Sequence, residues 1–149
     1  MEQENKEVGY VGKPKRVDTK ILKEIIKEDF VPVIVPMGLD EKGISYNINA
    51  DTAAGAVATS IKSRRLMLLT DIDGVIDNNE KLISEINTLE AKELIKNETI
   101  HGGMIPKVKT CIDAINNGVR AVVILDGRKP HSILYELFSD KGAGTLIRK

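Results

Sequence analysis

Unbroken apolar runs and helical apolar stripes alternate along most of this chain. Residues 31–36, 66–69 and 121–125 form continuous runs with the length and composition of strands that are buried on both faces. Between the runs, apolar residues recur at helical spacing, as in Ile21, Leu22, Ile25 and Ile26, and the alanines of residues 50–61 favour helix. The alternation predicts an α/β fold in which a mainly parallel sheet lies between two helical layers.

The two ends of the chain follow weaker patterns. Residues 8–17 alternate around two glycines and a proline, which is typical of a short exposed hairpin. Residues 145–147 are expected to add an edge strand after Gly142 and Gly144. The alternation of strands and helices in the central part of the chain predicts a three-layer sandwich, to which these two end segments add short extended pieces.

Composition narrows the class of function. A chain of 149 residues with 42% hydrophobic content is long enough to bury one core. Lys plus Arg and Asp plus Glu both total 22, so no net field attracts nucleic acid or an anionic membrane. The single cysteine, Cys111, rules out an intramolecular disulfide and fits a reducing compartment. Without a signal peptide or a long apolar span, the sequence predicts a soluble, cytoplasmic protein that acts on small molecules.

In parallel sheets, ligands bind beyond the carboxyl ends of the strands, and the first polar cluster lies in such a place. Asn47, Asn49 and Asp51 recur at every second residue, so they project from one face of extended backbone. The alternative is that Asn49 or Asp51 only caps the helix that begins near residue 50. Capping explains one of the three side chains, so a ligand role stays open.

The second cluster follows the apolar strand at residues 66–69. Thr70, Asp71, Asp73 and Gly74 stand at the carboxyl end of that strand, where a ligand site is expected, although an ordinary turn would use the same residues. An EF-hand calcium loop is excluded because that loop places glycine sixth, whereas Gly74 directly follows Asp73.

The third cluster is a glycine pair at the start of a helix. Gly102 and Gly103 precede the helical residues 104–115, and Lys107 lies about one turn inside. Free backbone N–H groups, the helix dipole and a lysine charge favour a phosphate there. The alternative is a lysine on a solvated helix flank, because a glycine-rich helix start is by itself a weak signal.

These clusters and four further segments give the chain a resemblance to the acetylglutamate kinases of the amino acid kinase family. The family's motifs occur in order from about residue 8 onward: Gly9-Tyr10-Val11-Gly12, Asn47-Ile48-Asn49-Ala50-Asp51, Leu69-Thr70-Asp71, Gly102-Gly103-Met104-Ile105-Pro106-Lys107, Asp126-Gly127-Arg128 with His131-Ser132, and Gly142-Ala143-Gly144-Thr145. The second and fourth segments are specific in combination. The resemblance implies an amino acid kinase-like fold, of which this chain is the C-terminal half.

The resemblance also implies a reaction and the residues that serve it. ATP with Mg²⁺, held through the nucleotide, would phosphorylate the side-chain carboxylate of N-acetyl-L-glutamate. By resemblance, Lys107 stabilises the transferring phosphoryl group, Asp51 orients the catalytic lysines, and the remaining residues bind ligands: Asn47 and Asn49 the acetylglutamate, and Thr70, Asp71, Gly103 and Met104 the nucleotide. Positioning and charge neutralisation are what phosphoryl transfer mainly needs.

The chain departs from the family at its beginning. Members have about as much chain again before the segment at Gly9, and that part carries a lysine, a glycine-rich phosphate loop and a substrate-binding arginine. We therefore expect residues 1–17 to be a tail and hairpin that continue from an absent N-terminal half, and residues 18–149 to be the nucleotide-binding lobe. The isolated chain is expected to have negligible kinase activity.

Regulation and assembly follow from the resemblance in the same way. Arginine-inhibited members bind this effector near positions that match Glu136 and Gly142. Alternatively, Glu136 is a solvated helix acid and Gly142 a helix terminator. The family forms homodimers or larger rings, but the N-terminal helix that builds the rings has no counterpart here.

Two other functions compete with the kinase. Asp71-Ile72-Asp73-Gly74-Val75 also resembles the first motif of haloacid-dehalogenase-like phosphohydrolases, with Asp71 as nucleophile, but no later acidic pair follows residue 125. A second alternative is a non-catalytic nucleotide-binding half that needs a separate N-terminal partner. Kinases of aspartate, glutamate or carbamate share parts of the nucleotide site, and the segment from Asn47 to Asp51 argues against them.

Overall fold

The structure is a computed structural model that describes residues 2–3 and 9–149. The chain forms two compact units, Met1–Lys62 and Ser63–Lys149. This boundary is one of spatial contact, and the functional division predicted at residue 18 stays a prediction. In the part of the chain that is described, no helix has the length and hydropathy needed to cross a membrane.

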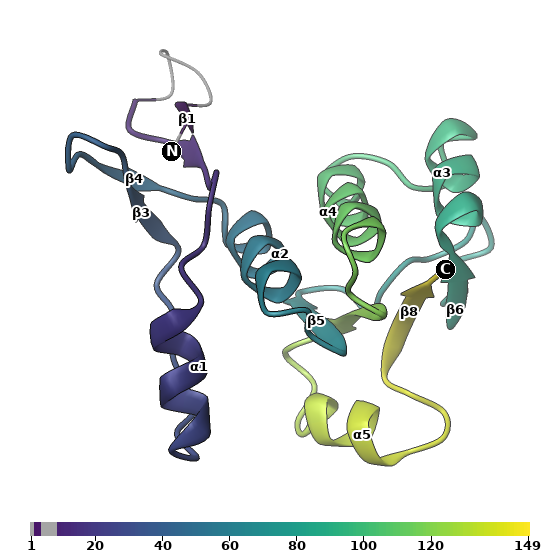
Figure 1. Ribbon diagram of the computed structural model, residues 1–149. Helices are drawn as coiled ribbons and strands as arrows, with labels where there is room; N and C mark the ends of the chain where they lie inside the picture. The colour runs from purple at the N-terminus through teal and green to yellow at the C-terminus, as the bar shows by residue number, and fades with distance from the viewer. Residues whose placement is uncertain (1, 4–8) are drawn as a thin grey trace. The chain divides into compact units, whose positions relative to one another are not determined.

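The described residues of the first unit form short strands and the helices α1 and α2 (Figure 1). Strands β1 (Glu2–Gln3) and β2 (Gly12–Lys13) pair antiparallel, as do β3 (Met37–Leu39) and β4 (Ser45–Asn47). Helix α1 (Lys20–Lys27) buries none of its residues, and helix α2 (Ala50–Ser60) buries Gly55 and Ala58. The predicted hairpin begins at Val8, which lies outside the described residues.

The second unit is built on a four-stranded sheet with the order β5-β7-β8-β6. Its strands are β5 (Arg65–Thr70), β6 (Glu85–Asn87), β7 (Ala121–Asp126) and β8 (Gly144–Arg148). The pairs β5–β7 and β6–β8 are parallel and β7–β8 is antiparallel, so the prediction of a mainly parallel sheet is confirmed. The prediction of an edge strand at residues 145–147 was wrong, because β8 lies between two strands and fully buries Thr145 and Ile147.

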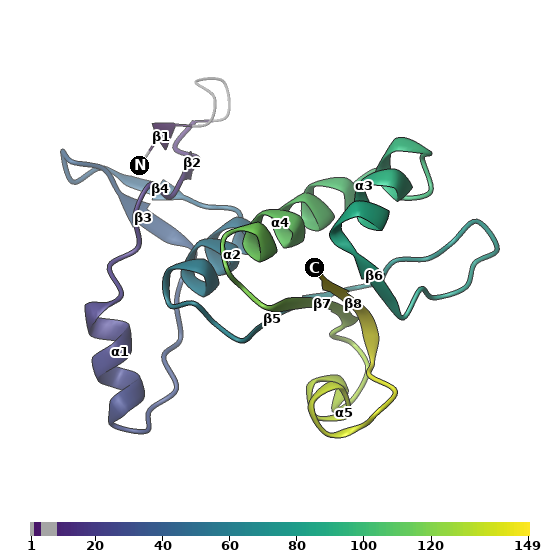
Figure 2. The same ribbon diagram turned by 45° about the vertical axis from the view of Figure 1, so that its right-hand side comes forward.

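Helices cover both faces of this sheet. Figures 1 and 2 show α3 (Thr88–Lys96) and α4 (Met104–Asn116) over one face and α5 (Ser132–Phe138) at the other. The core centres on β7, whose residues Val122, Val123, Ile124 and Leu125 are fully buried. Such a continuous apolar strand is expected where both faces of a sheet are covered.

One predicted strand is not formed. Residues 31–36 lie outside any sheet, and Val31 and Val33 are 87% and 92% exposed, so the prediction of a buried strand was wrong. Burial of such a run requires neighbouring strands, and the described residues of this unit supply only the short pairs β1–β2 and β3–β4.

Candidate functional site

The carboxyl ends of β5 and β7 lie side by side in the second unit. Thr70 and Asp126, the last residues of these parallel strands, are register partners. The backbone N–H of Gly127 donates to the Thr70 carbonyl at 2.8 Å, and Thr70 Oγ1 donates to Asp71 Oδ1 at 3.2 Å. Thr70 is half-buried and Asp71 exposed, so the structure places both predicted residues at the accessible end of the sheet.

Two cations join the acids at this end of the sheet. Arg128 Nη2 lies 2.9 Å from Asp126 Oδ2, and Lys129 Nζ lies 2.6 Å from Asp73 Oδ1. The side chains of Arg128 and Lys129 stay 67% and 53% exposed, so both can meet an anion from solvent. Neither cation was predicted as a site residue. The Asp126-Gly127-Arg128 motif was a signal for Arg128, whereas no motif pointed to Lys129.

The electrostatics of this end are fixed by the Asp126–Arg128 pair. Hydrogen bonds from the Arg128 side chain and backbone lower the pKa of Asp126 to about 2, against the opposing effect of burial. In turn, the hydrogen bond to Asp126 raises the pKa of Arg128, with smaller contributions from Asp71 and Asp73. Asp126 is therefore ionised, and Arg128 is charged, across the physiological range.

The start of α4 lies beside the loop that follows β5. Gly103 is the N-cap of α4 without a side-chain cap, and Gly102 has a positive φ of 55°. A Cβ at either glycine would meet nothing within 4 Å, so the surface before the helix is open. A cavity of about 400 Å³ is lined by His101 and Met104 from this start and by Ile72 and Gly74 from the loop. The structure thus brings these two predicted segments together.

Lys107 is oriented by the packing of α4. This helix buries Val108, Cys111, Ile112 and Ile115, and it packs on α3, β7 and β8. Lys107 precedes the fully buried Val108 and remains half-buried on the first turn. A lysine at such a margin can pack its aliphatic stem against apolar neighbours and keep its ammonium in contact with water.

The other predicted residues belong to the first unit. The backbone N–H of Asn47, at the end of β4, donates to the Tyr10 carbonyl at 2.8 Å. Asn49 is the N-cap of α2, and its Oδ1 accepts from the Thr52 backbone N–H at 3.1 Å. Asp51 lies in the first turn of that helix. The capping interpretation holds for Asn49. The role implied for Asp51, to orient the catalytic lysines, stays a prediction.

Glu136 and Gly142 lie in contact in the second unit. The buried Glu136 carboxylate accepts from the Ala143 backbone N–H at 2.8 Å and from Arg65 Nη1 at 3.4 Å. A Cβ on Gly142, whose φ is 67°, would come within 2.9 Å of Glu136 Oε2. Gly142 also lines a cavity of about 630 Å³ with His131 and Tyr135. Glu136 is therefore not a solvated acid, and sequence spacing could not find Arg65 as its partner.

Metal chemistry is limited by the donors available. Among residues 2–3 and 9–149, no three His, Cys, Asp or Glu side chains gather closely enough to form a metal cage. The acids near the end of β5 could still face a cation that arrives with a phosphate ligand, which is how Mg²⁺ usually binds in phosphoryl-transfer sites.

Comparison with known proteins agrees with this geometry. Residues 1–126 match the model of the amino acid kinase family, so this chain belongs to the amino acid kinase family. An acetylglutamate kinase from Pelagibacter ubique (strain HTCC1062) is 58% identical over 147 residues, which cover 99% of this chain and 51% of the relative. Another, from Bradyrhizobium sp. (strain ORS 278), is 51% identical over 96% of this chain and 48% of its own length. The chain spans about half the length of the curated relatives that it matches.

Solved structures agree on the fold. N-acetylglutamate synthase from Neisseria gonorrhoeae, complexed with coenzyme A and L-arginine, superposes with a TM-score of 0.88 at 28% identity, over 94% of this chain and 32% of the synthase. Carbamate kinase from Giardia lamblia, bound to citric acid, gives 0.70 at 25% identity, over 92% and 46%. These matches do not favour the phosphohydrolase alternative.

Proposed function

We propose that this chain forms the nucleotide-binding part of an acetylglutamate kinase, which transfers the γ-phosphoryl group of ATP to the side-chain carboxylate of N-acetyl-L-glutamate. The observation that carries the proposal is the site in the second unit, where Thr70 ends β5, Asp71 begins the loop that follows, and this loop lines a cavity with the start of α4. Identities of 50% to 58% with acetylglutamate kinases over nearly the whole chain support the choice of substrate.

On the nucleotide side, each residue has a role that suits its position. The Gly103 backbone N–H and the Lys107 ammonium would neutralise the phosphates and the charge that develops on the transferring group, and Met104, whose N–H already donates to the His101 carbonyl at 3.3 Å, would line the nucleotide site. Thr70 and Asp71 would bound the nucleotide at the end of the sheet, and Mg²⁺ would arrive with ATP. Little covalent chemistry is required of the protein, because the substrate carboxylate is itself the nucleophile.

On the acetylglutamate side, Asn47 and Asn49 would supply amide groups and Asp51 would orient the catalytic lysines. Because Asn49 Oδ1 already caps α2, its contact with substrate would use the amide Nδ2 as donor. An amide N–H is suited to the carbonyl or carboxylate oxygens of acetylglutamate.

The nucleotide role is tested by calorimetric titration of the 149-residue chain with Mg²⁺ and a non-hydrolysable ATP analogue. We expect Lys107→Met to weaken binding by about tenfold or more, because a charge-assisted contact with phosphate is lost. Lys109→Met removes the same charge from an exposed position on the same helix, and we expect its affinity to stay within about twofold. Equal affinities for the two variants would contradict the assignment of Lys107.

Turnover is a separate measurement. In a coupled assay, we expect no acetylglutamate-dependent ADP release by this chain alone and recovery when the remaining part of a kinase domain is supplied. Binding of the nucleotide without recovery would favour the non-catalytic alternative. The homodimer or larger oligomer implied by the family is tested by sedimentation of the same samples.

We also propose that the region of Glu136 and Gly142 responds to arginine. Glu136 already accepts a hydrogen bond from the guanidinium of Arg65, so its carboxylate is placed to recognise such a group, and a cavity adjoins Gly142. The synthase neighbour was solved with L-arginine. We expect L-arginine to raise the melting temperature of the chain. Citrulline, whose side chain is neutral, should not raise it, and the variant Glu136→Gln should not respond to L-arginine.

A further inference from the structure

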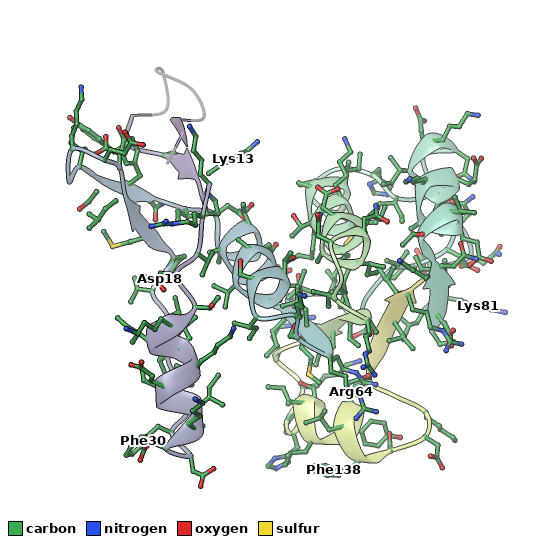
Figure 3. The ribbon with its side chains drawn as sticks, viewed as in Figure 1. Lys13, Asp18, Phe30, Arg64, Lys81 and Phe138 are labelled. Atoms are coloured by element: carbon green, nitrogen blue, oxygen red, sulfur yellow. The ribbon has the colours of Figure 1, made fainter. Side chains whose placement is uncertain are left out.

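A row of apolar side chains in the first unit lies on the surface between α1 and β3. Phe30, Val31, Val33, Ile34 and Val35 are 70%, 87%, 92%, 47% and 65% exposed. Figure 3 shows Phe30 where the chain turns back after α1, and Figure 2 shows the following residues running back alongside the helix. Isolated exposed apolar residues are ordinary, whereas five exposed apolar residues within six consecutive positions are typical of a surface that contacts another protein segment.

Beyond Phe30, whose N–H donates to the Ile25 carbonyl at 3.2 Å, the backbone of this segment makes few hydrogen bonds. Within the described residues, the N–H groups of Val33, Ile34 and Val35 donate no hydrogen bond, and the segment pairs with no strand. The Val35 carbonyl accepts only a local bond from Met37 at 2.8 Å. Extended backbone with free donors and acceptors is a template for pairing with another strand.

The composition indicates which kind of sheet would accept it. Apolar residues occupy both faces, which is typical of a parallel strand covered on each side. Pro32, which lacks an N–H, stands near the start of the segment, where a strand tolerates proline. Helix α1, which precedes the segment, leaves Ile21 64% and Ile26 48% exposed. Both the helix and the extended segment therefore present apolar side chains that another part of a sheet could cover.

We infer that residues 30–35 form the strand by which this chain joins the sheet of the remaining part of an amino acid kinase domain, supplied by sequence outside these 149 residues. Two observations select this occupant: the family match at residues 1–126 includes the segment, and the curated relatives are about twice as long as the chain. The inference rests on the proposed function, which it deepens by naming the surface that the other half contacts.

The experiment mixes the 149-residue chain with a polypeptide that comprises the portion of the Pelagibacter ubique relative outside its match to this chain. Hydrogen exchange is followed by mass spectrometry, and affinity by calorimetry. We expect the amides of residues 33–35 to exchange about tenfold more slowly or better in the mixture, because strand pairing protects them. The protection elsewhere in β7 should not change.

Two matched variants distinguish specific pairing through residues 30–35 from non-specific hydrophobic association. Val33→Asp places a carboxylate in the proposed sheet and should weaken association by about tenfold or more, since burying an unpaired charge is unfavourable. Leu89→Asp makes the same change at a residue of α3 that is 71% exposed, in a first helical turn that accepts an acid, and should change affinity by less than about twofold.

The inference would be overturned by no association, by association without protection at residues 33–35, or by equal loss of affinity in both variants. Protection that appears in the chain alone and grows with concentration would assign the surface to a second copy instead. Nucleotide titration of the same samples is an independent readout. If the two polypeptides associate but the mixture does not bind the ATP analogue, the proposed function is contradicted, whereas the pairing role of residues 30–35 is supported.

Discussion

Arg128 donates two side-chain hydrogen bonds to the buried carboxylate of Asp126, from Nε at 3.0 Å and from Nη2 at 2.9 Å, and its backbone N–H donates a third at 2.9 Å. The pair closes the turn that leaves β7, directly beside Thr70 at the end of β5. These three hydrogen bonds hold the Arg128 side chain at this end of the sheet.

This pair predicts a specific acid sensitivity. The folded pKa of Asp126, about 2, lies below the ordinary value of 3.8, so its contribution to stability is present above about pH 4 and is lost as the pH falls through about 2. Asp126→Asn should lower the urea midpoint at neutral pH and converge with the parent chain near pH 2. Asp113→Asn, on the exposed side of α4, serves as the charge control. A constant difference at every pH would contradict this account.

Thr145 should be the most sensitive polar residue of the core. It is fully buried, donates to the Ile83 carbonyl at 2.7 Å and accepts from the Val75 backbone N–H at 2.8 Å. Thr145→Val leaves both groups without partners, and we expect a loss of about 2 kcal/mol or more in the free energy of unfolding. Thr145→Ser should recover most of it, whereas Thr110→Val, at a partly exposed site on α4, should stay within about 0.5 kcal/mol.

Gly144 cannot accept a side chain. A Cβ there would clash with the Ile124 carbonyl oxygen and come within 2.9 Å of the Ile124 carbonyl carbon and of Leu125 Cα, all backbone atoms of the adjacent strand. We expect Gly144→Ala to lower the free energy of unfolding by about 3 kcal/mol or more. Gly103→Ala is the control, because its Cβ meets nothing and its φ of −65° suits alanine, and its melting temperature should be unchanged.

Asn49 allows its structural and binding roles to be separated. Asn49→Ala removes the cap of α2 and should cost about 1 kcal/mol, whereas Asn49→Asp keeps an accepting oxygen and should stay within about 0.5 kcal/mol. In a complete kinase, Asn49→Asp should raise the KM for acetylglutamate, because an anion replaces the amide donor beside an anionic substrate. An unchanged KM would leave capping as the only role of Asn49.

Apolar pattern alone located most of the second unit. The runs at residues 66–69 and 121–125 became β5 and β7, because residues that are apolar on both faces can be satisfied only inside a covered sheet. The same pattern at residues 31–36 failed, since burial depends on neighbouring strands that a local pattern cannot guarantee. For the same reason the sequence could not place β8, whose position between β7 and β6 depends on contacts between distant segments.

By itself, the sequence determined the residues that carry charge and polarity at the site: Thr70 and Asp71 after an apolar run, and Lys107 after a glycine pair. Only the tertiary structure decided which of them meet. It joined the loop after β5 to the start of α4, paired Asp73 with Lys129, and held Glu136 against Arg65, 71 residues earlier. Strand and helix periods act over a few residues, whereas these contacts arise when the sheet brings distant strand ends to one edge.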